Sequence, residues 1–392
     1  MDGTRRPDID WLRVGATYLL FLFHVGKVFD PAPFYHVRNA ELSFAMLVAC
    51  GFVSLWHMPL FFLLAGWSAA ASLRARGARA FLRERGRRLA IPLVAGCVLL
   101  APAIKYVELR SGLDLDHAGL RVAPALQEGF RSVIPGGLPT AAPFDECFLT
   151  FLPTFFTRLD RFSWSHLWFV AYLLTLTLVY LPLFAWLLAH RDRFAFRGRL
   201  VVYLPILPLA AIQLTMRARW PGIQNLYDDW ANVAYYSVFL VAGFLVACQP
   251  ALERAVHDEW RRSLAVAVAA TLVLFAAVLG VTSSPAVLLA GSAVAGWCFV
   301  VALLGIARRF ATVSGPALAY LSESAFPVYV LHQAAIALPG SLVVGLALGI
   351  ATKFVLLLLL SVALTMATYH WLVRPFGVGR FLLGMKPTRA AS

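Results

Sequence analysis

The sequence is dominated by long apolar segments that are joined by short, mostly basic connections. Each segment is compatible with the ~20 residues that a helix needs to cross the hydrocarbon core of a bilayer. Because lipid offers no hydrogen bonds to the backbone, such segments must be helical. We predict an all-α, polytopic integral membrane protein with about ten transmembrane helices. The predicted spans cover residues 11–29, 42–70, 89–108, 165–189, 200–216, 231–248, 263–281, 286–307, 325–349 and 353–373.

The charges of the chain follow the same pattern. Hydrophobic residues make up 60% of the 392 residues and charged residues only 14%, against roughly 25% in soluble domains. The formal net charge of +14 arises mainly from arginine clusters after every second span, with Arg217 and Arg219 as the main exception. This positive-inside pattern places both termini in the cytoplasm and argues against a nucleic-acid partner. The clusters lie in residues 74–88, 191–199, 254–262, 308–309 and 374–389.

One long polar stretch, residues 109–164, connects the third and fourth predicted spans on the side opposite the termini. It contains a turn-rich segment at 135–143 and ends in an aromatic run, FLTFLPTFFTRLDRFSW. That run predicts either an interfacial aromatic belt or a surface on which sugars stack. We expect residues 1–392 to form one membrane domain with this stretch as a long periplasmic loop, without a cleaved signal peptide.

The first predicted span carries four ionisable residues, Asp10, Arg13, His24 and Lys27. An ionisable residue at membrane depth costs about 2.5–3.5 kcal/mol, so each is a functional hypothesis. Arg13 and His24 share one helix face, about 16 Å apart along the axis. His24 is either a general base or a histidine held by an interhelical hydrogen bond. Asp10, the second catalytic candidate, either orients Arg13 or caps the helix.

An arginine-rich run, RARGARAFLRERGRRLAIP, precedes the third predicted span. Arg85 and Arg88 are three residues apart and would share one face of a helix. Guanidinium groups suit phosphate recognition because their planar fork is bidentate and always charged. The alternative is that these arginines only fix the topology at a cytoplasmic boundary. We therefore treat Arg85 and Arg88 as candidate ligands of a phosphate-bearing substrate.

The second predicted span contains SLWHMPLFFLLAGW, with His57 near the middle of the membrane. Pro59 frees a backbone carbonyl, and Gly66 permits close contact with another helix. His57 is either a packing histidine at the kink or a residue that supports catalysis.

Three other candidates for substrate contact or support lie in later spans. Trp168 follows His166 in SHLWFVAYLL, and anchoring at the outer membrane interface is the default interpretation for both. Tyr329 and His332 are three residues apart in FPVYVLHQ and share a helix face. Such a pair either holds helices together or contacts substrate. The sequence has no GxSxG, P-loop or HExxH motif and no Cys/His set with metal-ligand spacing, so we expect no metal site.

Taken together, these segments resemble the membrane-bound acyltransferase-3 family, especially its branch around the glucan biosynthesis protein C. The matching pieces are IDWLRVGATYLLFLFH, HMPLFFLLAGW, the run from Arg85 through Arg88 to Pro92, SHLWFVAYLL and FPVYVLHQ. They appear in the family's order over about residues 8–375. One departure is Ala65 before Gly66, where the family often has serine.

The resemblance implies a bacterial inner-membrane O-acyltransferase. Such an enzyme takes an acyl group, acetyl or succinyl, from cytoplasmic acyl-CoA and delivers it to a hydroxyl of a periplasmic or surface glycan. In the family, the histidine matching His24 is held to be essential, and the arginines matching Arg13, Arg85 and Arg88 are implicated in donor binding. Acyl-CoA is then a co-substrate, and no permanently bound cofactor is expected.

Two other functions fit the same residues. A transporter without acyl-transfer chemistry would use the intramembrane His and Arg as a substrate or proton path. An acyltransferase acting on a small molecule or lipid would use the same donor. Because no appended periplasmic transferase domain is expected, acceptor recognition is assigned to residues 109–164 or to a periplasmic partner protein. A homodimer is a further option.

Overall fold

The computed structural model describes residues 6–116, 119–131, 136–193, 198–281 and 284–387. Arg197 and Arg389, which belong to the predicted basic clusters, lie outside these residues, as does the first residue of the turn-rich segment at 135–143. The chain divides into two compact units. Unit 1 comprises Met1–Ala16, Phe52–Gly86 and Tyr172–Ser322; unit 2 comprises Thr17–Gly51, Arg87–Ala171 and Glu323–Ser392.

The all-α, polytopic class predicted from the apolar segments is confirmed. Among the described residues, eight helices are long and apolar enough to cross a membrane. A ninth is added if Ser165–Val179 and Leu181–Ala189, which meet at 53°, form one bent span. The count of ten and the cytoplasmic side of the termini stay predictions.

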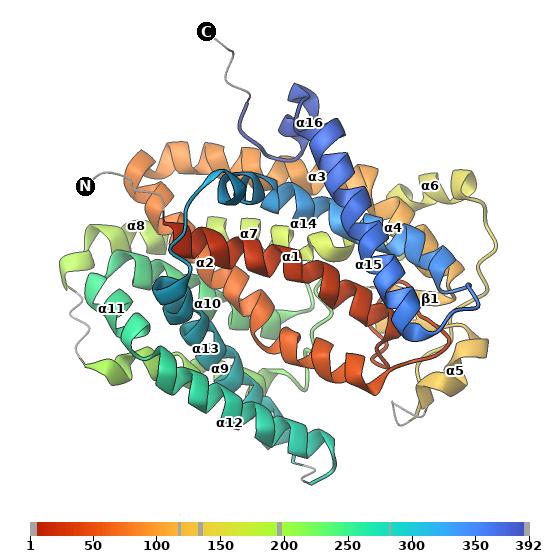
Figure 1. Cartoon of the computed structure of the whole chain (residues 1–392), viewed down its shortest axis with the longest axis horizontal. Helices are drawn as coiled ribbons and strands as arrows, with labels where there is room; N and C mark the ends of the chain where they lie inside the picture. The colour runs from red at the N-terminus through yellow and green to blue at the C-terminus, as the bar shows by residue number, and fades with distance from the viewer. Residues whose placement is uncertain (1–5, 117–118, 132–135, 194–197, 282–283, 388–392) are drawn as a thin grey trace. The chain divides into compact units, whose positions relative to one another are not determined.

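Unit 1 is built almost entirely of helices (Figure 1). Within it, α12 and α13 lie side by side. Nε1 of Trp297 in α13 donates a hydrogen bond to the carbonyl of Val202, 2.8 Å away. The elements wholly or partly in this unit are α1 (Pro7–Phe29), α2 (Phe44–Arg85), α7 (Trp168–Val179), α8 (Leu181–Ala189), η3 (Arg191–Arg193), η4 (Arg199–Tyr203), α9 (Ile206–Met216), α10 (Trp230–Cys248), α11 (Pro250–Asp258), α12 (Trp260–Val278), α13 (Pro285–Phe310) and α14 (Pro316–Val343).

Two glycines let α2 and α10 cross backbone to backbone. A Cβ placed on Gly66 would lie 1.9 Å from the carbonyl oxygen of Leu240, and one on Gly243 would lie 1.9 Å from that of Leu63. No side chain fits in either space. Small residues at a crossing let membrane helices approach closely and gain van der Waals contact. The close contact predicted for Gly66 is therefore present.

The arginine-rich segment, predicted as a connection after residue 70, is instead helical. α2 runs on to Arg85 because Ala, Leu and Arg, all good helix formers, fill its last turns. The helix is interrupted only at Gly77, whose φ of 72° is the left-handed conformation that glycine tolerates. A π-helical turn, η1 (Gly86–Ala90), then leads into α3 (Ile91–Leu99). Arg88 lies in this turn, so the α-helical spacing that placed it on the face of Arg85 is interrupted.

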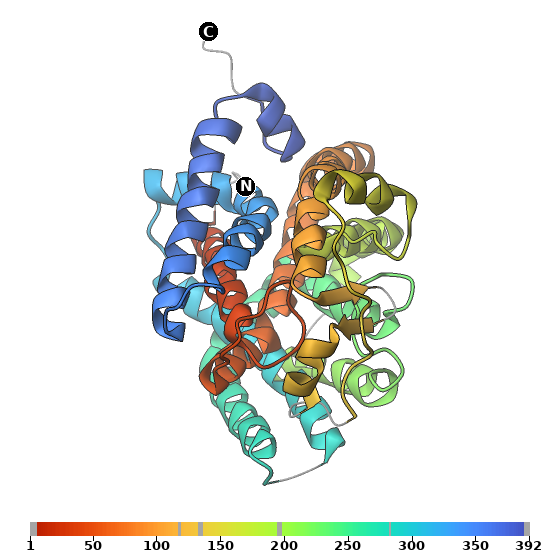
Figure 2. The ribbon, with the colours of Figure 1, turned by 90° about the vertical axis from the view of Figure 1, so that its right-hand side faces the viewer.

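Unit 2 combines helices with the one small sheet in the part of the chain described. Strands β1 (Leu113–Asp116) and β2 (Gly119–Val122) form an antiparallel hairpin that lies beside α5 (Pro124–Arg131) (Figure 2). Leu113, Val122 and Phe130 form the buried core between hairpin and helix. The described part of residues 109–164 thus contains regular secondary structure. Other elements of the unit are α3, α4 (Ala101–Arg110), α6 (Phe148–Thr157), η2 (Ser165–Leu167), α15 (Ile350–Ala367), η5 (Thr368–Val373) and α16 (Gly377–Leu382).

Candidate active site

Three histidines from separate segments of unit 2 form a cluster. His24 comes from α1, His166 from η2 and His332 from α14. The ring centroid of His332 lies 5.1 Å from that of His24 and 5.1 Å from that of His166. Each of these histidines lies in a motif noted in the sequence, but no spacing predicts that the three meet.

Two of these rings are fixed by backbone carbonyls. Nε2 of His166 lies 2.9 Å from the carbonyl oxygen of Val330, and Nδ1 of His332 lies 2.6 Å from that of Tyr329. His332 is fully buried and His166 nearly so. His24 is partly exposed, so it is the ring of the cluster that a substrate can reach.

Two tyrosines complete the cluster. The ring of Tyr35 stacks on that of His24, with centroids 5.7 Å apart. Burial raises the pKa of Tyr35, so its hydroxyl stays protonated. Tyr329 donates its hydroxyl to the carbonyl oxygen of His166, and its ring lies 5.8 Å from that of His332. The Tyr329–His332 pair predicted from spacing is present, and its hydrogen bonds position the neighbouring segment.

Arg13 belongs to unit 1, where two polar partners hold it. Its Nη1 lies 3.3 Å from Oδ1 of Asp10, and its Nη2 donates to Oγ of Ser68 at 3.0 Å. Asp10 lies within α1, which begins at Pro7, so it is not the residue that precedes the helix. Of the two roles considered for Asp10, the geometry therefore favours orienting Arg13.

Arg85 and Arg88 differ in their surroundings. Arg85 is partly buried, and its guanidinium lies over the ring of Phe81, 4.9 Å from the centroid. Arg88 is exposed, and its backbone packs closely against Gly384 within unit 2. Arg85 belongs to unit 1 and Arg88 to unit 2.

His57 and Trp168 lie inside the protein. Nε2 of His57 donates to the carbonyl of Ala16 at 2.7 Å, and its side chain is 2% exposed. This contact is that of a packing histidine, which ties α2 to α1 within unit 1. Trp168 and His166 are both buried, whereas interfacial anchors would be exposed at the surface. Their burial favours a packing role over anchoring, and their place at the outer membrane interface stays a prediction.

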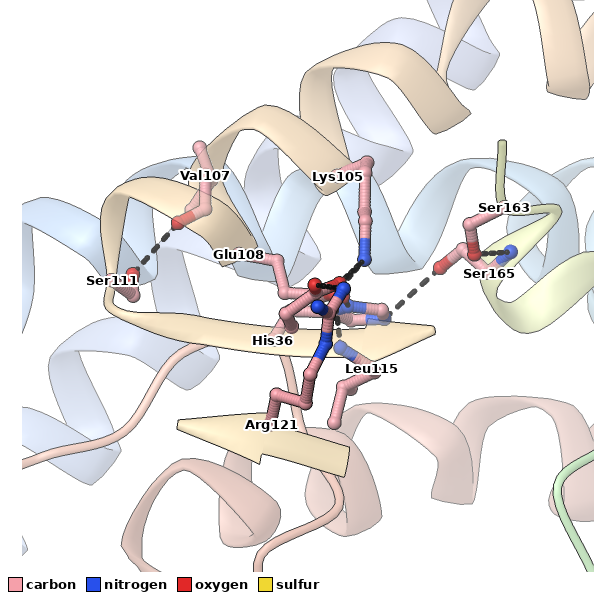
Figure 3. Close-up of polar contacts among 10 residues, drawn as sticks. His36, Lys105, Val107, Glu108, Ser111, Leu115, Arg121, Ser163 and Ser165 are labelled. Carbon is pink, nitrogen blue, oxygen red and sulfur yellow. Dashed lines mark hydrogen bonds and ion pairs between the residues drawn. The ribbon is translucent and has the colours of Figure 1, made fainter. Parts of the chain in front are cut away.

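A second polar cluster, missed in the sequence, surrounds His36 in the connection between α1 and α2 (Figure 3). Nδ1 of His36 lies 2.5 Å from Oε2 of Glu108, and Nε2 lies 3.0 Å from Oγ of Ser165. Glu108 is fully buried. Its other oxygen, Oε1, accepts hydrogen bonds from Nζ of Lys105 at 2.5 Å and from the amide of Leu115 at 2.7 Å.

The charges of this cluster balance. Lys105 also donates to Oδ1 of Asp114, 2.7 Å away, and Arg121 pairs with the other oxygen of Asp114. Two carboxylates thus face two cations, which stabilises ionised groups away from water. Nowhere in the described residues do three His, Cys, Asp or Glu side chains come together to hold a metal ion.

Unit 1 also contains a basic cavity of about 490 Å³. Its lining comes from the end of α11, the start of α12 and the end of α13, which lie at predicted cytoplasmic boundaries. The indole of Trp260 lies there under the guanidinium of Arg261, 5.2 Å from the ring centroid. A positive cavity with an aromatic wall suits an anion that carries a planar ring. The lining residues are His257, Asp258, Trp260, Arg261, Gly305, Arg308 and Arg309.

The long apolar helices define a multi-pass membrane protein, and buried polar clusters lie among them. The acyltransferase-3 family model, described as an acyltransferase domain, matches residues 6–370. The chain therefore belongs to this family of acyltransferases, as the sequence motifs indicate. No curated protein and no solved structure matches the chain.

Proposed function

We propose that this acyltransferase is an O-acyltransferase of the bacterial inner membrane. It moves an acetyl or succinyl group from cytoplasmic acyl-CoA to a hydroxyl of a periplasmic or surface glycan. The observation that carries the proposal is the position of His24, partly exposed at the edge of a buried cluster of histidines, in a chain of the acyltransferase-3 family.

In this proposal His24 handles the proton or the acyl group. A neutral imidazole removes the proton from an acceptor hydroxyl as that oxygen attacks the acyl carbonyl. Alternatively, it takes the acyl group itself and then passes it on. In both routes Asp10 acts through Arg13, which it holds in place for the donor.

The donor's phosphates are assigned to arginines. Arg13, Arg85 and Arg88 are the residues implied by the family, and each presents a permanently charged guanidinium. The basic cavity in unit 1 supports a donor that is a nucleotide, since Arg261, Arg309 and Trp260 line it. Phosphates pair with the arginines, and an adenine ring stacks on the indole.

The cavity's role is tested by enzyme kinetics. Replacing both Arg261 and Arg309 with glutamine is expected to raise KM for acyl-CoA about tenfold or more, as the loss of two charge-assisted hydrogen bonds predicts. The value of kcat should change little. Arg191→Gln, outside the cavity lining, is the matched control. An unchanged KM in the double variant would remove the cavity from the donor site.

The acceptor is assigned to the ordered part of residues 109–164. Helix α6 buries Phe151 and Phe155 and leaves Phe156 50% exposed. An exposed aromatic ring offers an apolar face on which a sugar packs. A partner protein on the same side is the other source of acceptor specificity.

The reaction is tested with purified protein and radiolabelled acetyl-CoA or succinyl-CoA, in the presence of membrane glycans. We expect release of free CoA and label in the glycan fraction. CoA release and glycan labelling should both be lost in His24→Ala. They should both be retained in His370→Ala, which replaces an exposed histidine of η5. A wild-type protein that cleaves neither thioester would instead favour a transporter. Label in a lipid or small molecule would reassign the acceptor.

A further inference from the structure

Hydrogen bonds connect Ser165 to His36 and His36 to Glu108 (Figure 3). A nucleophile, a general base and an orienting carboxylate are connected in the same order in a catalytic triad. We propose that they form a catalytic triad and that the acyl group passes through an ester on Ser165. The proposal deepens the function above and rests on it for the identity of the thioester donor. It adds a covalent carrier that the sequence motifs do not reveal, and in this route His36 takes the general-base role that direct transfer gives to His24.

The hydrogen bonds define the role of each group. Oε1 of Glu108 is occupied by Lys105 and the amide of Leu115, which leaves Oε2 to accept Nδ1–H of His36. Nε2 of the neutral imidazole then accepts the hydroxyl proton of Ser165, 3.0 Å away. This is the geometry by which a weak hydroxyl nucleophile is activated, and it is recognised by contacts rather than by sequence order.

The backbone of Ser165 is also unusual. Its φ of 49° is in the left-handed region, which a non-glycine residue adopts at a cost of about 1–3 kcal/mol when the surrounding structure imposes it. Its amide donates to Oγ of Ser163 at 3.0 Å. Such strain is typical of nucleophilic serines placed on a sharp turn before a helix. Here the turn is η2, and α7 follows directly.

The triad adjoins the histidine cluster. The ring of Tyr35 lies 5.7 Å from that of His24 and 5.5 Å from that of His36. On the other side, Ser165 precedes His166, whose ring lies 5.1 Å from that of His332. Tyr35 thus contacts both a histidine of the cluster and the base of the triad.

The chemistry has two half-reactions. First, Oγ of Ser165 attacks the thioester carbonyl carbon while its proton passes to Nε2 of His36. The tetrahedral adduct breaks its C–S bond, and His36 returns the proton to the departing thiolate, giving acyl-serine and a free thiol. In the second half, the acceptor hydroxyl gives its proton to His36 and attacks the ester. The C–O bond to Ser165 breaks, and Oγ regains the proton.

A serine-directed fluorophosphonate probe tests the triad without any acyl donor. In the detergent-solubilised full-length protein, we expect peptide mass spectrometry to find the probe on Ser165. Labelling should be absent in Ser165→Ala, and its rate should fall about 100-fold or more in His36→Gln. Ser111→Ala is the matched control, because Ser111 lies in the same unit and its hydroxyl donates to the backbone carbonyl of Val107. No label on Ser165 in a protein that transfers acyl groups would overturn the proposal.

A trapping experiment separates this proposal from the function it rests on. Wild-type protein is incubated with radiolabelled acetyl-CoA or succinyl-CoA without acceptor and digested. An oxygen ester on Ser165, stable to mild acid and released by hydroxylamine, supports the triad. If CoA release and glycan labelling proceed while Ser165→Ala works at the normal rate, the triad fails and the function stands. If neither thioester is cleaved but the probe still labels Ser165, the donor assignment fails and the triad stands.

Discussion

The imidazole of His24 lies against that of His332, with 5.1 Å between the ring centroids. His332 is itself fixed through the carbonyl of Tyr329. The pair joins a partly exposed ring to a fully buried one, so His332 limits the positions that His24 adopts.

We predict that His332→Leu lowers kcat for acyl transfer and leaves KM for acyl-CoA unchanged. Misplacing a catalytic group costs about 10²-fold, because the reacting atoms no longer align. The measurement is steady-state kinetics of CoA release. An equal change in KM would mean that His332 contacts the donor rather than positioning His24.

A second prediction concerns the crossing of α2 and α10. Gly66→Ala places a methyl group 1.9 Å from the carbonyl oxygen of Leu240, and backbone atoms cannot move aside as a flexible side chain does. Overpacking of this kind costs about 1–3 kcal/mol. Thermal unfolding in detergent should show a lower midpoint. Gly51→Ala lies in the same helix and has no atom within 4 Å of the added carbon, so it should leave the midpoint unchanged.

A third prediction concerns pH. Burial raises the pKa of Asp229 above its ordinary value of 3.8, although Oδ2 accepts hydrogen bonds from Tyr172 at 2.6 Å and Asn232 at 2.9 Å. Between the ordinary and the raised pKa, the unfolded state releases its proton while the folded state keeps it. The free energy of unfolding therefore falls as the pH rises through this window.

Asp229→Asn removes this titration. Its unfolding midpoint is expected to decline less than that of the wild type between about pH 4 and about pH 7. The measurement is a series of thermal unfolding curves over that range. Parallel curves for the two proteins would show that the carboxyl group does not titrate differently in the folded state.

A fourth prediction concerns Lys105, whose side chain is 2% exposed between two carboxylates. Lys105→Met leaves Glu108 and Asp114 without their shared cation. Breaking a buried pair in this way costs about 3–5 kcal/mol, so the midpoint of chemical or thermal unfolding should drop strongly. Arg121→Met removes a cation that is 38% exposed and should cost much less. Equal losses of stability in the two variants would mean that burial of the cation does not determine the cost of removing it.

The sequence predicts the helical class well because bilayer thickness and backbone hydrogen bonding leave few alternatives. It misses the continuation of α2 through the arginine-rich segment, where the charges suggested a connection but the residues favour a helix. It also misses the hairpin Leu113–Val122, whose strands have only four residues each. Short elements of this kind are fixed by packing, here around Phe130, rather than by periodicity.

Only part of the candidate site can be predicted from the sequence, for a similar reason. His24 is recognisable because an ionisable residue in an apolar span is rare. Ser165 and His36 are not, since 129 positions separate them and 72 separate His36 from Glu108. No local spacing connects such residues. The only sequence signal is the serine that begins the SHLWFVAYLL motif.

The charge balance around Glu108 also bears on biogenesis. Lys105 and Glu108 lie one turn apart on α4 and neutralise each other within a single helix. Asp114 and Arg121 face each other across the β-hairpin, which therefore docks as a second neutral pair. At neither stage of assembly does this region have to take an uncompensated charge out of water. The helix and the hairpin can therefore fold one after the other, in the order of their synthesis.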